Sequence, residues 1–435
     1  MVTKTIKIAN GVSLKYIETD KFKTNYFSFN FISPLSKERN HFNAMIPLIL
    51  MRGCKKYPNQ AEINKRLQYL YSGEVIAKND VFGEHQIIGF KANMLDNRFS
   101  SETDITIETI SLICDLLFDP LLENGAFTDS FVIGEKNNLI DIIESEKNNK
   151  TSYSIARLKE EMCKDEVFGI SKYGKSKDVE SITSKSLYDA YKEMISSYPI
   201  EIYFVGQCDI NSLAELLKKR FINIERNVIE IPKAETIEKS TEVKRIVDTE
   251  RVKQGKLCLG FRTGYKVEHN KYYLLQLFNE VFGSSPTSKL FVNVREKMSL
   301  CYYCKSLINQ RNGLMIVASG IEFDNKEIAE NAIIKQLEDI KNGYITEEEF
   351  ESAKKSIRNG YLQIYDSAES METWAFYRGI CQSNATPLDE CDKIDTATIE
   401  DVKSVAEKIT LDTVYFLKGT EETEVENGWF FYERK

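Results

Sequence analysis

Histidine and cysteine are the side chains most able to bind zinc or act as nucleophiles, and in this chain their spacing favours neither role. The three histidines, His41, His85 and His269, have no histidine or cysteine three or four residues away, so no helical or turn-type zinc pair is present. Cys301 and Cys304 form the only C-x-x-C pair. A redox pair should open a helix after a strand, whereas the residues that follow here are typical of a strand. We therefore expect solvated or capping histidines, and alternating burial in a sheet for the C-x-x-C segment.

Motifs for nucleotide binding or serine hydrolysis are also absent. The sequence contains no G-x-G-x-x-G, G-x-x-x-x-G-K-[ST] or G-x-S-x-G segment. The carboxylates at 347–349 follow Thr346, and a threonine with a glutamate three residues later is a capping box at the start of a helix. Negative charge is favourable at that end of a helix, which explains the run without catalysis. We expect no cofactor.

Residues 290–302, which read LFVNVREKMSLCY, combine an arginine and a tyrosine at a fixed spacing. They resemble the second-domain motif of the pitrilysin/insulinase family of zinc metallopeptidases, L-F-x-x-[IV]-R-E-K-x-G-L-x-Y. In that family the arginine and the tyrosine, seven residues apart, face the peptide substrate, which implies this role for Arg295 and Tyr302. The match departs at Ser299, where the family usually has glycine, so we expect a slightly different turn there.

The resemblance extends over both halves of the chain. Phe282-Gly283 with Ser288 to Leu290 is similar to the family's approach to the arginine motif, and Ile345 to Phe350 with Ala353-Lys354 is similar to its T-x-E-E helix. In the first half, residues 53–56 match the segment after the zinc helix, and residues 198–206 resemble the strand that closes the first domain. Because these motifs follow the family's order, the chain is identified as a member.

The family's metal site is missing from this sequence. Active members have H-x-x-E-H on a helix, in which two histidines one turn apart bind zinc and the glutamate polarises the attacking water. Counted back from the glycine after that helix, the corresponding positions are Ala44, Pro47 and Leu48. The third ligand, a glutamate on a later helix, corresponds to Ile142, and a shift of one residue would offer only Asp141. The resemblance therefore implies no bound zinc and no peptidase activity of its own. Pro47 should also bend or shorten its helix.

The elements that would position these residues form two similar halves. Residues 227–255 are rich in charge, so we expect a linker and the entry to a second domain there, between domains at 1–226 and 256–435. Each half contains a strand, two helices and an Asn-Gly turn; these lie at 25–32, 41–51, 107–118 and 124–128, and at 255–262, 271–282, 326–341 and 342–346. This order predicts an α+β fold of two homologous domains, each a mainly antiparallel sheet with helices packed on one face, as in half of the family's clamshell. Thr128 and Thr346 should begin equivalent helices.

Composition and charge exclude several classes of partner. Of the 435 residues, 42% are hydrophobic and 29% charged, as in a globular protein with a core. A net charge of −8 argues against nucleic acid or an anionic membrane as the main partner. The first twenty residues lack the apolar region of a secretory signal, and the longest apolar run, 45–51, is too short for a membrane helix. Nine cysteines without framework spacing favour reduced thiols, and so a cytoplasmic location.

The retained and the lost motifs together imply a function. Non-catalytic members of the family pair with catalytic ones around an enclosed peptide. Arg295 and Tyr302 therefore imply the non-catalytic, substrate-binding subunit of a heterodimeric peptidase, whose partners are a zinc-bearing paralogue and a peptide substrate. One alternative is a stand-alone peptide-binding or chaperone-like scaffold, as a single chain or a homodimer. Another is an enzyme with new chemistry at Cys301.

A second contact with the peptide is expected at residues 72–80 (SGEVIAKND). In the family the substrate adds a strand to the corresponding edge, where main-chain hydrogen bonds give affinity that tolerates many sequences. We therefore expect an exposed edge strand that faces the chamber. The alternative is an ordinary edge strand, protected from pairing by Lys78 and Asp80.

Overall fold

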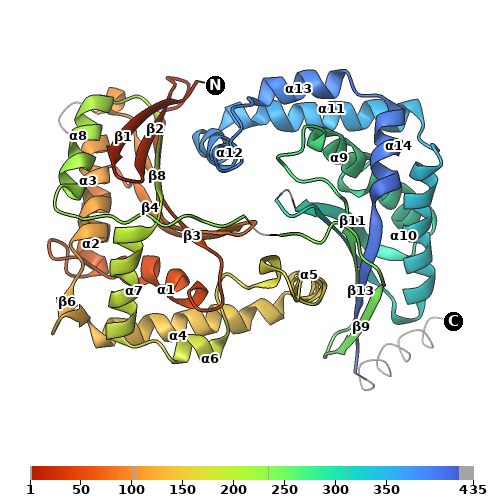
Figure 1. The fold of residues 1–435 in the computed structure, drawn as a ribbon, viewed down its shortest axis with the longest axis horizontal. Helices are drawn as coiled ribbons and strands as arrows, with labels where there is room; N and C mark the ends of the chain where they lie inside the picture. The colour runs from red at the N-terminus through yellow and green to blue at the C-terminus, as the bar shows by residue number, and fades with distance from the viewer. Residues whose placement is uncertain (1, 101–103, 234, 310, 421–435) are drawn as a thin grey trace. The chain divides into compact units, whose positions relative to one another are not determined.

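Two compact units make up the computed structural model, which describes residues 2–100, 104–233, 235–309 and 311–420 (Figure 1). The first unit consists of Met1–Glu144, Ile170–Lys233 and Ile364–Ile380, and the second of Ser145–Gly169, Ala234–Gln363 and Cys381–Lys435. Each unit thus contains a segment from the other half of the sequence. None of the helices in the described ranges is long and apolar enough to span a membrane.

The first unit is built on a six-stranded sheet in the order β1-β2-β8-β3-β5-β4. The strands are β1 (Lys4–Ala9), β2 (Val12–Glu18), β3 (Thr24–Pro34), β4 (Glu74–Phe82), β5 (His85–Leu95) and β8 (Ile200–Gly206). β2 and β8 run parallel, and all other neighbours are antiparallel. Along β3, Phe27, Phe29 and Phe31 enter the main core, whereas Ser28 and Asn30 between them lie on the opposite face. The sheet therefore has one aromatic face and one more polar face.

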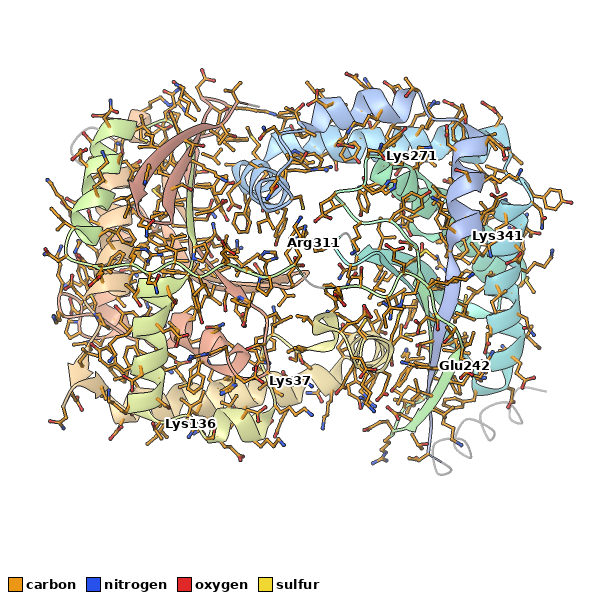
Figure 2. All side chains as sticks on the ribbon, in the orientation of Figure 1. Lys37, Lys136, Glu242, Lys271, Arg311 and Lys341 are labelled. Atoms are coloured by element: carbon orange, nitrogen blue, oxygen red, sulfur yellow. The ribbon has the colours of Figure 1, made fainter. Side chains whose placement is uncertain are left out.

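The helices that the first half of the chain contributes to the first unit cover the aromatic face, as predicted. They are α1 (Asn40–Leu50), α2 (Gln60–Tyr69), α3 (Ile105–Phe118), α4 (Asp129–Ser145), α6 (Ser176–Glu180), α7 (Ser184–Ser197) and α8 (Ile210–Phe221), with a short hairpin of β6 (Leu122–Glu123) and β7 (Ala126–Phe127) before α4. Lys136, labelled on α4 in Figure 2, donates to the carbonyls of Glu180 and Ile182 at 2.5 and 3.0 Å. These bonds fasten α4 to the end of α6.

The second unit is built on a five-stranded sheet in the order β11-β12-β10-β13-β9. Its strands are β9 (Lys244–Thr249), β10 (Gly255–Arg262), β11 (Cys301–Asn309), β12 (Leu314–Ile321) and β13 (Thr410–Lys418). Its helices are α9 (Tyr272–Asn279), α10 (Lys326–Lys341), α11 (Glu347–Gln363), α13 (Pro387–Asp395) and α14 (Ile399–Lys408), with π-helical segments at Glu280–Ser284 and Leu290–Lys297. Short 3-10 turns of the two units lie at Asn97–Phe99, Glu146–Asn148, Val167–Gly169, Phe323–Asn325 and Ile364–Asp366.

The two sheets repeat one topology, which confirms the predicted fold class. The order β2-β8-β3-β5-β4 corresponds strand for strand to β9-β13-β10-β12-β11, and in each the first pair is parallel and the other pairs are antiparallel. Thr128 and Thr346 directly precede the 17-residue helices α4 and α11, so the expected equivalence of these threonines also holds. The expected linker is partly structured, because residues 244–249 form β9 of the second sheet.

Each unit receives one helix from the other half of the chain. The helix α5 (Lys150–Met162) packs on the second sheet, where Leu158 joins a cluster with Cys258 and Tyr415. The equivalent helix of the second half, α12 (Ala368–Ile380), packs on the polar face of the first sheet through Phe376 and its neighbours. The domain bounds expected from the sequence, 1–226 and 256–435, assign α5 to the first domain and α12 to the second, whereas each helix packs in the other unit. An amphipathic helix can cover either of two similar sheets, so its periodicity does not indicate which one it joins.

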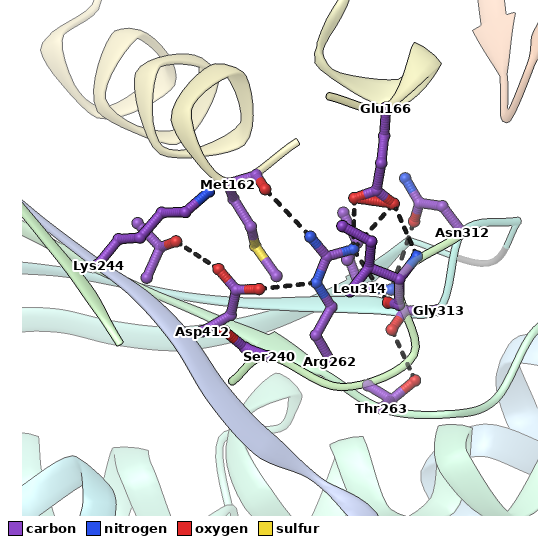
Figure 3. Close-up of polar contacts among 12 residues, drawn as sticks. Met162, Glu166, Ser240, Lys244, Arg262, Thr263, Asn312, Gly313, Leu314 and Asp412 are labelled. Carbon is purple, nitrogen blue, oxygen red and sulfur yellow. Dashed lines mark hydrogen bonds and ion pairs between the residues drawn. The ribbon is translucent and has the colours of Figure 1, made fainter. Parts of the chain in front are cut away.

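A buried ion network holds the end of α5 in the second unit. Arg262, 1% exposed on β10, donates through Nη2 to the carbonyl of Met162 at 3.1 Å (Figure 3). Its Nη1 lies 2.6 Å from the carboxylate of Glu166, and its Nε lies 2.9 Å from that of Asp412. The network therefore joins β10 and β13 to residues that follow α5 in the chain.

Candidate functional site

The helix α1 carries three of the four positions that correspond to the family's zinc ligands and catalytic glutamate. Ala44 and Pro47 are buried among apolar side chains, and Leu48 is partly buried. Pro47 does not end the helix, which continues to Leu50. The fourth position, Ile142, is half-buried on α4. These side chains cannot coordinate a metal, and no group of three His, Cys, Asp or Glu side chains within the described residues could hold one. A zinc ion therefore does not fit this site.

A buried network of amides lies beside these positions. Asn43 on α1 donates to the side-chain oxygens of Ser33 and Gln86, both at 3.0 Å, and accepts from the hydroxyl of Tyr198 at 3.3 Å. Gln86 in turn donates to the backbone carbonyl of Asn40 at 3.2 Å. Neutral groups of this kind rigidify a core but supply neither a metal ligand nor a general base. Sequence reasoning missed this network, although two asparagines one turn apart on an apolar helix are a visible signal.

Arg295 and Tyr302 are both accessible, and each contacts a carboxylate of its own unit. Arg295 lies in the segment Leu290–Lys297, where its guanidinium stacks 4.5 Å from the ring centre of Phe291 and its Nε lies 3.6 Å from the Glu296 carboxylate. Tyr302 on β11 is 63% exposed, and its hydroxyl donates to the Glu322 carboxylate at 2.7 Å. This hydrogen bond raises the pKa of Tyr302, so the hydroxyl keeps its proton at neutral pH. Within the described residues, no hydrogen bond joins Arg295 to Tyr302.

A β-bulge presents Tyr302. Cys301 lies opposite Ile321 and Tyr303 opposite Gly320, so Tyr302 is an extra residue in the edge strand β11. Ser299 has a φ of 51°, the left-handed conformation that favours glycine. Ser299 therefore adopts a conformation that costs a serine more than it would cost a glycine. The expected difference from the family's turn stays a prediction.

The same bulge changes the arrangement of Cys301 and Cys304. Their partners on β12, Ile321 and Ser319, are two residues apart and so share one face of the sheet. The bulge thus adds one residue between the two cysteines and puts them on one face. Burial still alternates along β11, as expected: Cys304 and Ser306 are buried, and Lys305 and Leu307 are exposed. The thiols hydrogen-bond, which lowers the pKa of Cys301 and raises that of Cys304.

The strand β4 lies at the edge of the first sheet and, within the described parts of the chain, pairs with β5 alone, which confirms the predicted edge position. Tyr71 and Ser72 both have a φ of 58°, so the chain turns there and the strand begins at Glu74. At Asn79 the edge is covered, because the ammonium of Lys172 donates to its backbone carbonyl at 2.9 Å. Whether this edge faces a chamber stays a prediction.

Comparison with known proteins relates this chain to peptidases. A family model described as "Peptidase M16 inactive domain" matches residues 181–357. The chain is 36% identical over 412 residues to "Probable inactive metalloprotease YmfF" of Bacillus subtilis (strain 168), which covers 94% of this chain and 96% of that protein. It is 22% identical over 418 residues to "Antilisterial bacteriocin subtilosin biosynthesis protein AlbE" of the same organism, covering 94% and 100% of the two chains. A crystal structure of a conserved protein from Enterococcus faecalis V583 superposes with a TM-score of 0.90 at 26% identity and covers 96% of this chain and 99% of that one.

Proposed function

The chain belongs to the M16 peptidase family, the group of pitrilysin- and insulinase-like enzymes, as an inactive homologue, and we propose that it is the non-catalytic, substrate-binding subunit of a heterodimeric zinc peptidase. One contrast carries the proposal. The positions of the zinc ligands hold mostly buried apolar side chains, whereas Arg295 stays accessible in the segment Leu290–Lys297 and Tyr302 is exposed on the bulged edge strand β11. The proposed partner is a zinc-bearing paralogue. Nine free cysteines fit a cytoplasmic location.

The two exposed side chains would act on the peptide that the partner cleaves. Arg295 offers several fixed N–H donors for a substrate carbonyl or carboxylate. The protonated hydroxyl of Tyr302 would donate to the oxyanion that forms when a water on the partner's zinc attacks the peptide. Each side chain must first leave its carboxylate, Glu296 or Glu322. Exposed contacts of this kind contribute only about 1 kcal/mol, so substrate can displace them.

The open edge of β4 would supply the main-chain contacts. A peptide that adds a strand there gains backbone hydrogen bonds with little dependence on its sequence. The printed name of AlbE links one full-length relative to bacteriocin biosynthesis, which agrees with a peptide as the class of substrate. The same open edge also favours a second candidate function, a peptide-binding scaffold that works without a catalytic partner, as a single chain or a homodimer.

Turnover by the mixed complex tests the proposal. The chain is co-expressed with an H-x-x-E-H paralogue from the same genome, and cleavage of a quenched fluorescent peptide is measured. We expect Arg295→Ala or Tyr302→Phe to lower kcat roughly a hundredfold while the two chains still co-purify. Matched controls on exposed positions of the same unit, Lys305→Ala and Tyr344→Phe, should leave turnover unchanged.

Full activity in a complex that carries both substitutions would show that Arg295 and Tyr302 do not contribute to turnover and that this subunit only encloses the substrate. Failure of the two chains to associate, together with peptide binding by this chain alone, would favour the scaffold.

A further inference from the structure

A polar pocket lies in the first unit, on the sheet face that α12 covers. Its volume is about 410 Å³, within the range of about 300–1,000 Å³ that small-ligand sites occupy. The lining residues come from β3, β4, β5, α12 and the segment before α6; they are Tyr26, Lys78, Asp80, Val81, Lys91, Lys172, Glu369, Thr373 and Tyr377. The pocket therefore adjoins the edge strand β4.

Three ammonium groups in the pocket have hydrogen-bond donors to spare. Each of Lys78, Lys91 and Lys172 carries three N–H donors, and among the residues that the structure describes each ammonium has one hydrogen-bond acceptor. The acceptors are the Asn30 amide oxygen at 2.8 Å, the Glu369 carboxylate at 2.7 Å and the Asn79 carbonyl at 2.9 Å, in that order. These single bonds hold the ammonium groups in place and leave further donors for a ligand.

Two tyrosines add hydroxyl groups without a partner. Tyr26 is 1% exposed and lines the pocket, and within the described residues neither its hydroxyl nor that of Tyr377 makes a hydrogen bond. Burial, followed by nearby carboxylates, raises the pKa of both, so both hydroxyls are protonated donors at neutral pH. Both hydroxyls line the pocket, so each can donate a hydrogen bond to a ligand there.

The hydrogen-bond balance indicates which ligand. Three ammonium groups face two lining carboxylates, Asp80 and Glu369, and a third carboxylate, the 1% exposed Glu372 on α12, acts on both tyrosines from beneath the lining. Glu372 accepts from Ser28 on β3 at 2.6 Å. The ammonium and hydroxyl groups of the lining still offer more donors than these carboxylates use, which favours a ligand with several acceptor oxygens, such as a carboxylate.

We propose that this pocket binds a carboxylate of a peptide that is paired with the edge strand β4. The inference rests on the proposed function, in which a peptide adds a strand to this edge. Lys78 and Asp80 alternate with Asn79 along β4, so every second side chain of an added strand would lie on the same face as the pocket. Lys172 covers the edge at Asn79, so an added strand ends there, beside the pocket. The carboxylate could be the C-terminus of the peptide or an Asp or Glu side chain near that end, because either group accepts hydrogen bonds from the lysines and tyrosines of the pocket.

Binding of three labelled peptides to the full chain tests this inference. The probes are a fluorescein-labelled octapeptide of alternating Thr and Val with a free C-terminus, its C-terminal amide, and the amide with one Asp near the end. Anisotropy should show that the free acid binds at least tenfold more tightly than the amide. Tight binding of the Asp-containing amide would make a side-chain carboxylate an equivalent ligand.

Variants separate the pocket from the edge. Tyr26→Phe and Lys172→Met should abolish the tenfold preference for the free acid while leaving the weaker binding of the amide intact. Tyr16→Phe, at a buried tyrosine of the same unit outside the pocket, is the matched control and should keep the preference. Equal binding of acid and amide by the unmodified chain would overturn the pocket inference and leave the proposed function standing. If none of the three peptides binds, both the strand added at β4 and the carboxylate bound in the pocket are overturned. The role proposed for Arg295 and Tyr302 is then tested separately, by turnover of the mixed complex.

Discussion

The two units hold their exchanged helices in different ways, although their sheets share one topology. In the second unit α5 fits closely, because a Cβ atom at Gly260 of β10 would lie 2.6 Å from the sulfur of Met162, and Arg262 adds a buried network of charges. In the first unit α12 packs through an apolar cluster around Phe376, but its other contacts are polar and enclose a pocket. The same position in a duplicated fold is thus closely packed in the second unit and borders a polar pocket in the first.

Removal of the ion network should give the largest effect on stability. Arg262→Met leaves the carboxylates of Glu166 and Asp412 buried without their cation, so we expect the free energy of unfolding to fall by about 3–5 kcal/mol. Urea denaturation measures this change. Arg251→Met, at an exposed position of the same unit, should change it by less than about 0.5 kcal/mol. A loss below about 1 kcal/mol in Arg262→Met would contradict the role of the network in holding α5.

The cysteines of the two units should differ in reactivity. Cys208 in the first unit and Cys301 in the second are both half-buried, but burial raises the pKa of Cys208 to about 12, whereas the hydrogen bond with Cys304 lowers that of Cys301. Because the thiolate is the reactive form, iodoacetamide at pH 7.5 should modify Cys301 at least roughly tenfold faster than Cys208, and the rate should fall as the pH is lowered. Mass spectrometry of tryptic peptides gives both rates. Similar rates would remove the observation that favours thiol chemistry at Cys301.

The smallest expected effect on stability comes from the hydrogen bond between Glu372 on α12 and Ser28 on β3. Glu372→Gln keeps the shape of the side chain and an oxygen that can accept from Ser28, so the unfolding free energy should fall by only about 1 kcal/mol. Urea denaturation beside Arg262→Met compares the two units directly. If Glu372→Gln proved as destabilising as Arg262→Met, the two helices would be held equally firmly, and the contrast between the units would fail.

Features that depend on local sequence patterns or on the family's motifs could be predicted from the sequence. The helix expected at 326–341 has the observed bounds, and the one expected at 41–51 is shifted by one residue. The doubled fold and the inactive family were also predicted, because motifs in a fixed order identify both. The bulge at Tyr302 and the exchanged helices were not, since both depend on pairing between segments distant in the chain. The pocket was missed for the same reason: Tyr26, Lys91 and Glu369 carry no motif and meet only when α12 joins the first sheet.

The exchange of α5 and α12 also bears on how the chain folds during synthesis. The first sheet has all its strands once residue 206 has left the ribosome, but its polar face is not covered until residues 364–380 follow. The interval from Lys233, where the first unit's earlier part ends, to Ile380 is 380 − 233 = 147 residues, or roughly 7 to 30 s at ordinary rates of translation. During that time Tyr26, Ile87 and Tyr203 lack their partner helix. We therefore expect the nascent chain to expose an uncovered sheet face during this interval, when chaperone binding or misfolding would compete with the docking of α12.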